Sequence, residues 1–309
     1  MSRIWGQVGV LGCVAALALA GCGTNGSSTT LPSATQGWVH NGNVVYHVPH
    51  YMPSRSAAAQ QQIGAASNYL FIYYAGPVLL NPKTYLILWG YKKYGDPDGV
   101  AKLLEAYLPL EGGSGHNNIY TQYYETVSAR PVFITNPKGQ SGGFWDDEKD
   151  AVPLNPTDTQ VAAEVVIGVK HFGYDPYGSY IVATPHGRST TGFGTAWCAY
   201  HSIAIADGKN VSYTNFPYMP DVGLNCGAGY IPAPKDEPLN DEGVTIVAGH
   251  EYGESITDPE LGTGWYLSPY EIGDVCAWMH IKNLKFGKKS FTMQPMYSNA
   301  DQSCVQTYK

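Results

Sequence analysis

The sequence predicts an α+β protein, a single large domain with a mixed β-sheet and a central helix that carries the pattern HExxE. Three observations support this fold class. Segments rich in β-branched and aromatic residues are interspersed with segments whose apolar residues recur at helical spacing. The two kinds of segment do not alternate strictly, as they would in a doubly wound parallel sheet. About 250 residues follow a polar N-terminal stretch, which suffices for one substantial core.

The first half of this domain contains two expected strands and a helix. Residues 69–74 and 84–89 are rich in aromatic and branched side chains. Gly76-Pro77 and Asn81-Pro82 lie between them, as expected for strands that are joined by a turn. Residues 98–108 then have a helical pattern.

The second half contains a longer helix and a hairpin. Residues 158–172 place Val161, Val165 and Val169 on one side of a helix. Asp207-Gly208 between two β-rich runs predicts a tight hairpin turn. The strands expected in this half are residues 130–135, 180–184, 202–206 and 211–216.

The N-terminus has the pattern of a lipoprotein signal peptide over residues 1–21. Arg3 supplies the basic region, Val8 to Leu19 the apolar region, and Leu19-Ala20-Gly21-Cys22 a lipobox. The apolar region is too short to span a bilayer. We expect cleavage before Cys22, lipidation of Cys22, and a membrane-anchored protein on the outer face of the cell membrane, or in an outer membrane where the organism has one.

Composition separates a tether from the domain and excludes one class of partner. Residues 23–35 contain almost nothing that could form a core, so we predict a flexible tether over residues 22–60 and the domain over 61–309. The formal net charge is −7 at pH 7, so nucleic acid is not an expected partner.

Four cysteines are expected to form two disulfides. Cys13 leaves with the signal peptide and Cys22 is lipidated, so the remaining thiols lie in an oxidising compartment. Four cysteines allow three pairings, among which the sequence does not choose. Proximity along the chain favours Cys198–Cys226 and Cys276–Cys304.

The HExxE pattern lies in a helix expected over residues 241–257, which Asp258-Pro259 ends. His250 and Glu254 are four residues apart and project from one face, while Glu251 lies on the adjacent row. In the related HExxH helix, two histidines hold zinc and the glutamate serves as general base. A carboxylate can replace the second imidazole as a zinc ligand. The alternative is an ordinary helix whose acids are hydrogen-bonded or solvated.

Four blocks of the chain are together similar to one known family. The blocks are residues 76–90, 120–124, 193–202 and 249–276, and they keep a consistent order along the chain. They resemble the EXORDIUM, or phosphate-induced protein 1, family of plants and its bacterial relatives. This resemblance implies an exported protein at the cell surface or wall.

A second similarity, to thermolysin-like gluzincins, concerns the metal ligands. In those enzymes a downstream acidic helix supplies the third zinc ligand, and Glu271 and Asp274 occupy a comparable place here. The resemblance therefore implies that one of these two acids completes the site. His201, in the third EXORDIUM-like block, is the expected donor to a developing oxyanion or else a structural histidine.

These residues predict a surface-anchored, zinc-dependent metallopeptidase-like hydrolase that acts on extracellular peptides or proteins. Glu251 is the expected general base, with His250, Glu254 and either Glu271 or Asp274 as ligands. Two carboxylate ligands offset the charge of zinc, so Ca²⁺ is the alternative ion. The competing hypothesis is a non-catalytic binding or signalling protein of the EXORDIUM type, with a structural metal or none. A two-carboxylate glycosidase also stays open, because its acids have no fixed spacing.

Overall fold

A six-stranded mixed sheet forms the centre of the computed structural model, which describes residues 39–41, 44–46, 50–61 and 69–309. Strands β11, β9, β5 and β8 are parallel, whereas β10 runs antiparallel to its two neighbours, β11 and β3. The predicted mixed sheet is therefore confirmed. In spatial order the strands are β3 (His50–Pro53), β10 (Trp197–Ala206), β11 (Lys209–Phe216), β9 (Gly178–Ala183), β5 (Lys83–Trp89) and β8 (Ser141–Asp147).

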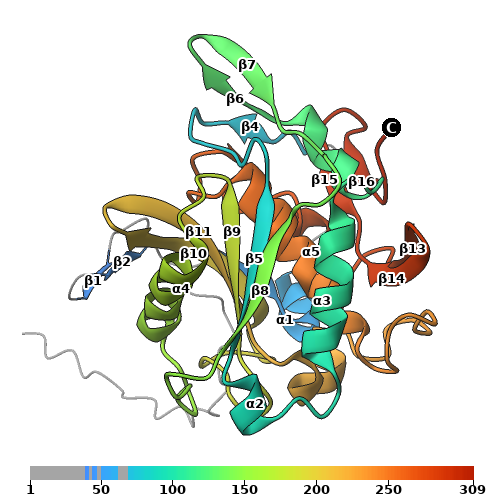
Figure 1. The fold of residues 1–309 in the computed structure, drawn as a ribbon. Helices are drawn as coiled ribbons and strands as arrows, with labels where there is room; N and C mark the ends of the chain where they lie inside the picture. Colours follow the sequence, from blue (N-terminus) through green and yellow to red (C-terminus); the bar gives the residue numbers. More distant parts are fainter. Residues whose placement is uncertain (1–38, 42–43, 47–49, 62–68) are drawn as a thin grey trace, which may run out of the picture.

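Helices cover both faces of this sheet (Figure 1). α4 (Asp158–Phe172) packs on one face, and its predicted bounds are confirmed. Thr157 starts it by accepting from the Gln160 amide in a capping box. α5 (Glu242–Thr257), the HExxE helix, packs on the opposite face against β10 and β11. α3 (Val100–Glu111) lies beside α5, which is thus enclosed between the sheet and another helix.

The alternation of side chains along β10 decides which residues face α5. The hydroxyls of Tyr200 and Tyr213 donate to Asp158 at the start of α4. His201 is the next residue of β10, and its register partner on β11 is Thr214. Because successive strand residues point to opposite faces, His201 and Thr214 face α5.

The β10–β11 hairpin forms as predicted. Asp207 and Gly208 connect the two strands with φ values of 49° and 74°. A two-residue turn with both φ values positive matches the right-handed twist of the flanking strands, and glycine adopts such a conformation at no steric cost.

The first predicted strand pair is wrong in its pairing. β4 (Ile72–Tyr73) pairs with β12 (Trp265–Tyr266), far along the chain, rather than with β5. β5 instead lies between the parallel strands β8 and β9 and is buried over almost all of its length. A buried central strand gains two hydrogen-bonded ladders, which a hairpin with β4 would not supply.

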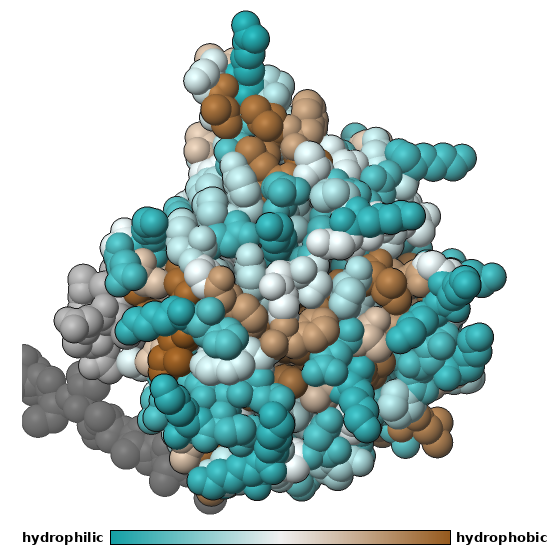
Figure 2. Space-filling model, viewed as in Figure 1, coloured by the Kyte–Doolittle hydropathy of each residue, from teal (hydrophilic) through white to brown (hydrophobic). Residues whose placement is uncertain are grey.

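Short pairs and helices complete the described chain. The β6–β7 hairpin projects from the body, and Figure 2 shows hydrophobic side chains on it. Phe133 is 50% exposed there and lies outside both hydrophobic clusters of the core. The remaining elements are β1 (Val39–Asn41), β2 (Val44–Tyr46), α1 (Arg55–Gln61), α2 (Tyr91–Tyr94), η1 (Asn117–Gln122), β6 (Tyr124–Val127), β7 (Arg130–Phe133), η2 (Met219–Cys226), η3 (Asp274–Cys276), β13 (Lys282–Phe286), β14 (Lys289–Met293), β15 (Met296–Ser298) and β16 (Ser303–Val305).

The tether expected over residues 22–60 needs a correction at its C-terminal end. β3 is an edge strand of the central sheet, and α1 follows it directly. Met52 and Ala57 are buried, and Trp278 donates from its indole nitrogen to the Pro53 carbonyl. Residues 50–60 therefore belong to the domain, because a short apolar segment gains enough burial once the sheet provides an edge.

The expected signal peptide and the lipidation site at Cys22 lie outside the described residues. Among the residues that are described, no helix combines the length and the apolar character that crossing a bilayer requires.

The two disulfides join Cys198 to Cys226 and Cys276 to Cys304, as proximity along the chain favoured. The first ties β10 to η2. The second ties η3, which contains Asp274, to β16 near the C-terminus. Both bonds therefore lie close in sequence to residues expected in the site.

Candidate metal centre

The HExxE helix is buried along its entire length. Every residue from Glu242 to Thr257 is buried, as expected of a helix with apolar residues around its whole circumference. Two glycines make this enclosure possible on the side away from the sheet. A Cβ at Gly249 would lie 2.8 Å from the Tyr107 hydroxyl, and one at Gly253 would lie 2.4 Å from the Tyr120 hydroxyl. Neither position tolerates a larger side chain without displacing its tyrosine.

His250, Glu254 and Asp274 converge on one point. His250 Nε2 lies 3.2 Å from Glu254 Oε2 and 3.8 Å from Asp274 Oδ1. The helix supplies the first two residues one turn apart, and η3 brings the third from a separate segment. All three are at most 3% exposed. The expected pairing of the helix with a downstream acid is thus present in space, and Asp274 is the acid that reaches His250.

Backbone amides orient Glu254. Its Oε1 accepts hydrogen bonds from the amides of Gly273 and Asp274, each at 3.0 Å. Its Oε2 has no hydrogen-bond partner and faces the imidazoles. A Cβ at Gly273 would lie 2.7 Å from Glu254 Oε1 and 2.8 Å from His250 Nδ1. Sequence reasoning missed Gly273, although its place between the two downstream acids was a signal.

His201 joins the cluster from β10. Its Nδ1 lies 3.3 Å from Glu251 Oε2 and 3.8 Å from Glu254 Oε2, while its Nε2 lies 3.3 Å from Glu271 Oε1. Glu271 therefore lies beside His201, whereas Asp274 lies beside His250. Because both ring nitrogens of His201 lie against carboxylates, the geometry favours a positioning role for this residue over donation to an oxyanion.

Gln294, a second residue that the sequence did not indicate, holds the His250 ring. Its Nε2 lies 2.9 Å from His250 Nδ1 and donates to the Gly273 carbonyl at 3.1 Å. An amide nitrogen at Nδ1 leaves the proton of a neutral ring on Nε2, facing Glu254. An ion bound at Nε2 displaces that proton, and Gln294 must then present its amide oxygen to Nδ1–H. That oxygen has no hydrogen-bond partner at present.

Burial and mutual charge act in opposite directions on the imidazoles. Burial alone would lower the pKa of His250, but Glu254, Glu251 and Asp274 together raise it to about 9. In the same way, Glu271 and Glu251 outweigh burial and raise the pKa of His201 well above 6.5. Burial raises the pKa of Glu251, against the effect of the two imidazoles. Without a bound cation, protons on the two imidazole rings thus offset the negative charge of the neighbouring carboxylates.

The six predicted site residues therefore form one buried cluster that could hold a metal ion. Its ligand atoms fall into two groups, each with all atoms within 4.8 Å of one another. Their individual roles and the identity of the ion stay predictions. The first group is His250, Glu254 and Asp274, and the second is His201, Glu251 and Glu254.

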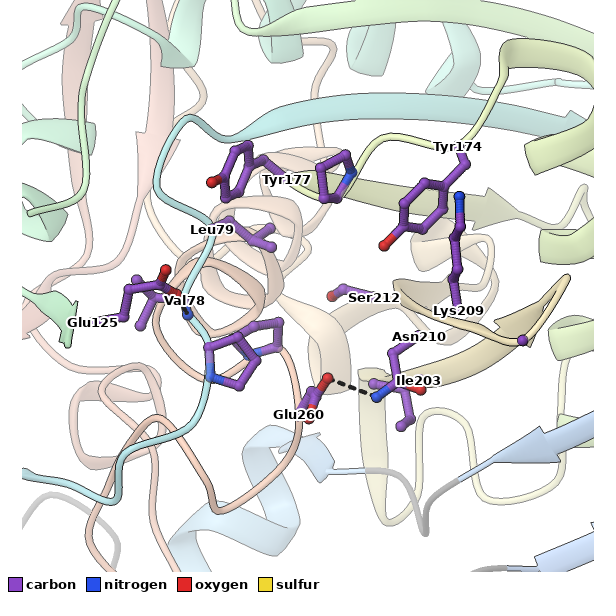
Figure 3. Close-up of a pocket in the computed structure, with 14 residues that line it drawn as sticks. Val78, Leu79, Glu125, Tyr174, Tyr177, Ile203, Lys209, Asn210, Ser212 and Glu260 are labelled. Carbon is purple, nitrogen blue, oxygen red and sulfur yellow. Dashed lines mark hydrogen bonds between the residues drawn. The ribbon is translucent and has the colours of Figure 1, made fainter. Parts of the chain in front are cut away.

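A pocket of about 490 Å³ lies on the same face of the sheet as His201. Ile203 and Ser212, register partners on β10 and β11, contribute to its lining. In Figure 3, Tyr174 and Tyr177 lie along one side, and Glu260 lies on the other, hydrogen-bonded to a neighbouring asparagine. Ile203 is two residues from His201 on the same strand face, a separation of about 7 Å. None of the six cluster residues lines the pocket, so the pocket lies about one strand repeat away from the cluster along β10.

Comparison with protein-family models, curated proteins and solved structures finds no match for this chain, so its resemblance to EXORDIUM proteins and to gluzincins stays a prediction that rests on its own residues.

Proposed function

We propose that this protein is an exported, membrane-anchored metal-dependent hydrolase that cleaves peptide bonds in extracellular peptides or proteins. The observation that carries the proposal is the convergence of His250, Glu254 and Asp274, from two separate segments, beside the carboxylate of Glu251. Zn²⁺ is the proposed ion, because imidazole and carboxylate oxygen are both common zinc ligands. The lipobox at Cys22 and the two disulfides support the proposed location.

The distances within the first group suit a small divalent ion. In a tetrahedral site with metal–ligand bonds of about 2.1 Å, neighbouring ligand atoms lie about 3.4 Å apart. The distances from His250 Nε2 to Glu254 Oε2 and to Asp274 Oδ1 are 3.2 Å and 3.8 Å. Three protein ligands leave a fourth position for water, as in catalytic zinc sites.

Glu251 is placed to move the proton in the reaction. A water molecule attacks the carbonyl carbon of a peptide bond while Glu251 accepts one of its protons. Glu251 returns that proton to the amide nitrogen as the C–N bond breaks, which releases a carboxylic acid and an amine. A bound divalent ion would supply polarisation of the water and of the carbonyl oxygen. His201 holds Glu251 in place through the 3.3 Å contact of its Nδ1.

The nearby pocket favours catalysis over a purely structural ion, because it offers space for part of a substrate on the same face of the sheet. Its apolar and tyrosine-lined walls suit one side chain of a peptide substrate, held about one strand repeat from His201. The rim also offers polar groups, including Glu260 and Asn210, that could orient a peptide backbone.

The test combines metal content with hydrolysis of peptide substrates. The purified protein should contain metal by elemental analysis, and a chelator should abolish hydrolysis. Glu251→Gln should lower kcat at least about 100-fold, the contribution of a general base, while the protein keeps an ion at His250, Glu254 and Asp274. Glu105→Gln, at an exposed position of α3, is the matched control and should leave activity unchanged. Hydrolysis that survives both the chelator and Glu251→Gln would exclude this mechanism.

A second function, a non-catalytic surface protein of the EXORDIUM type with a structural metal, is favoured by one observation. All six cluster residues are at most 3% exposed. Stoichiometric metal without hydrolysis of any peptide in a diverse library would support this function over the first.

A further inference from the structure

We propose that the buried cluster holds two divalent ions, bridged by Glu254, rather than one. This inference rests on the metal site of the proposed function and adds to two of its roles. His201 and Glu251 become ligands of the second ion, where Glu251 binds through Oε2, which faces His201, and keeps Oε1 for the proton of the reaction. The two groups of ligand atoms share a single residue, Glu254. Each group offers one imidazole and two carboxylates, a complete set of three protein ligands for one ion.

Glu254 has the geometry of a bridging ligand. Its Oε2 lies 3.2 Å from His250 Nε2 on one side and 3.8 Å from His201 Nδ1 on the other. The amides that bind Oε1 prevent the carboxylate from turning away. Oε2, which is buried and accepts no hydrogen bond, is thus directed to the boundary between the two groups. Its nearest polar atoms are the two imidazole nitrogens, and contact with two cations would compensate the charge of this buried oxygen.

Each histidine is also held by a residue outside its own group of ligands, as metal-ligating histidines generally are. His201 contacts Glu271 through Nε2, which leaves Nδ1 on the side of Glu251 and Glu254. His250 contacts Gln294 through Nδ1, which leaves Nε2 on the side of Glu254 and Asp274. His201 Nδ1 and His250 Nε2 therefore belong to different groups of ligands, one for each ion.

Charge favours two ions over one. The cluster brings four carboxylates together with two imidazoles, all of them buried. With neutral imidazoles, one divalent ion leaves two negative charges uncompensated, whereas two divalent ions give a neutral centre. Buried charge without compensation is strongly unfavourable. Carboxylate and imidazole ligands suit Zn²⁺ and Mn²⁺, and two such ions bridged by one carboxylate would lie about 3.5–4 Å apart.

The experiment measures metal stoichiometry in the mature, disulfide-bonded protein. Metal is removed with a chelator, and Zn²⁺ or Mn²⁺ alone is then titrated back. We expect two equivalents per chain by elemental analysis, and spin-coupled Mn²⁺ pairs by electron paramagnetic resonance. One equivalent, or two without spin coupling, would overturn the two-ion centre. A single equivalent with hydrolysis would leave the proposed function intact, so the two failures are distinguishable.

Variants assign each ion to its group. Asp274→Asn and His201→Gln should each lower the stoichiometry from two to one, and Glu254→Gln should weaken both sites at least tenfold. His171→Gln, at an exposed position of α4, is the control for the histidine variant and should keep two equivalents. If a variant does not fold, the number of metal equivalents and the Mn²⁺ spin coupling of the wild-type protein still test the two-ion centre. Loss of both equivalents in folded His201→Gln would contradict separate sites.

Discussion

At the scale of single residues, the centre depends on neighbours that carry no charge. Gly273 contributes an amide to Glu254 and lies against the His250 ring, so its lack of a side chain is a requirement of the site. Gln294 orients His250 through a single contact. Gln294 gives no signal in a search for ligands, because glutamine is common throughout soluble proteins, whereas Gly273 is marked only by its place between Glu271 and Asp274.

Gly273→Ala tests this requirement. The backbone at Gly273 has φ −83° and ψ −39°, which alanine adopts freely, so any effect comes from the added methyl group. That methyl group would lie 2.7 Å from Glu254 Oε1, and we expect metal affinity to fall about 10–100-fold. Metal titration measures the effect. Gly115→Ala, where the nearest atom is a Thr307 methyl carbon at 3.2 Å, is the control and should bind metal normally.

At the scale of secondary-structure elements, α5 and α4 are held by different means. α5 is enclosed by apolar and tyrosine side chains, and its glycines allow the close approach. α4 carries a buried acid, Glu164, which faces Asp147 at the end of β8. Burial first, and then the Asp147 carboxylate, raise the pKa of Glu164 to about 9. The helix is therefore joined to the sheet by a carboxyl group that holds its proton at neutral pH.

This pair predicts a pH dependence of stability. Because the pKa of Glu164 is raised in the folded state, the folded protein binds this proton more tightly than the unfolded chain does. The free energy of unfolding should therefore fall as pH rises from about 5 towards 9, by up to about 1.4 kcal/mol per pH unit. Glu164→Gln should flatten that decline, as measured by urea unfolding at several pH values. An unchanged slope would exclude Glu164 as its source, and exposed Glu148→Gln is the control.

At the scale of the whole molecule, the site joins segments that are distant in sequence. β10 brings His201, α5 brings His250, Glu251 and Glu254, and η3 brings Asp274. β10 is held by ladders on both sides, whereas η3 is a short 3-10 turn. The Cys276–Cys304 disulfide therefore contributes more to the order of its segment than the Cys198–Cys226 disulfide does.

Removing each disulfide in turn should show this difference. Serine at Cys276 and Cys304 should weaken metal binding more than serine at Cys198 and Cys226, because η3 loses its covalent tie to β16. Each bond closes a loop with a separation of 28 residues, so each loss should cost a similar unfolding free energy, about 3–4 kcal/mol. Metal titration and urea unfolding separate the two effects. Equal losses of metal affinity in the two disulfide variants would contradict the idea that η3 depends more on its disulfide than β10 does.

Local patterns in the sequence predicted α4, α5 and the β10–β11 hairpin correctly. Helical periodicity, a proline stop and an Asp-Gly turn depend on residues within a few positions of one another. The same patterns gave β4 the wrong partner and placed residues 50–60 in a tether. Short strands have no local signal for their partner, since pairing depends on which edge or surface the rest of the fold presents.

The sequence by itself determined the composition of the centre: one helix with His250, Glu251 and Glu254, and downstream acids close enough in the chain to return to it. Only the tertiary structure decided that Asp274 reaches His250 while Glu271 reaches His201, and that Glu254 lies between two groups of ligands. The physical reason is that helical spacing follows from the backbone of one segment. The sheet register, the packing of α5 and the turn at Gly273 decide instead which downstream carboxylate contacts which buried imidazole.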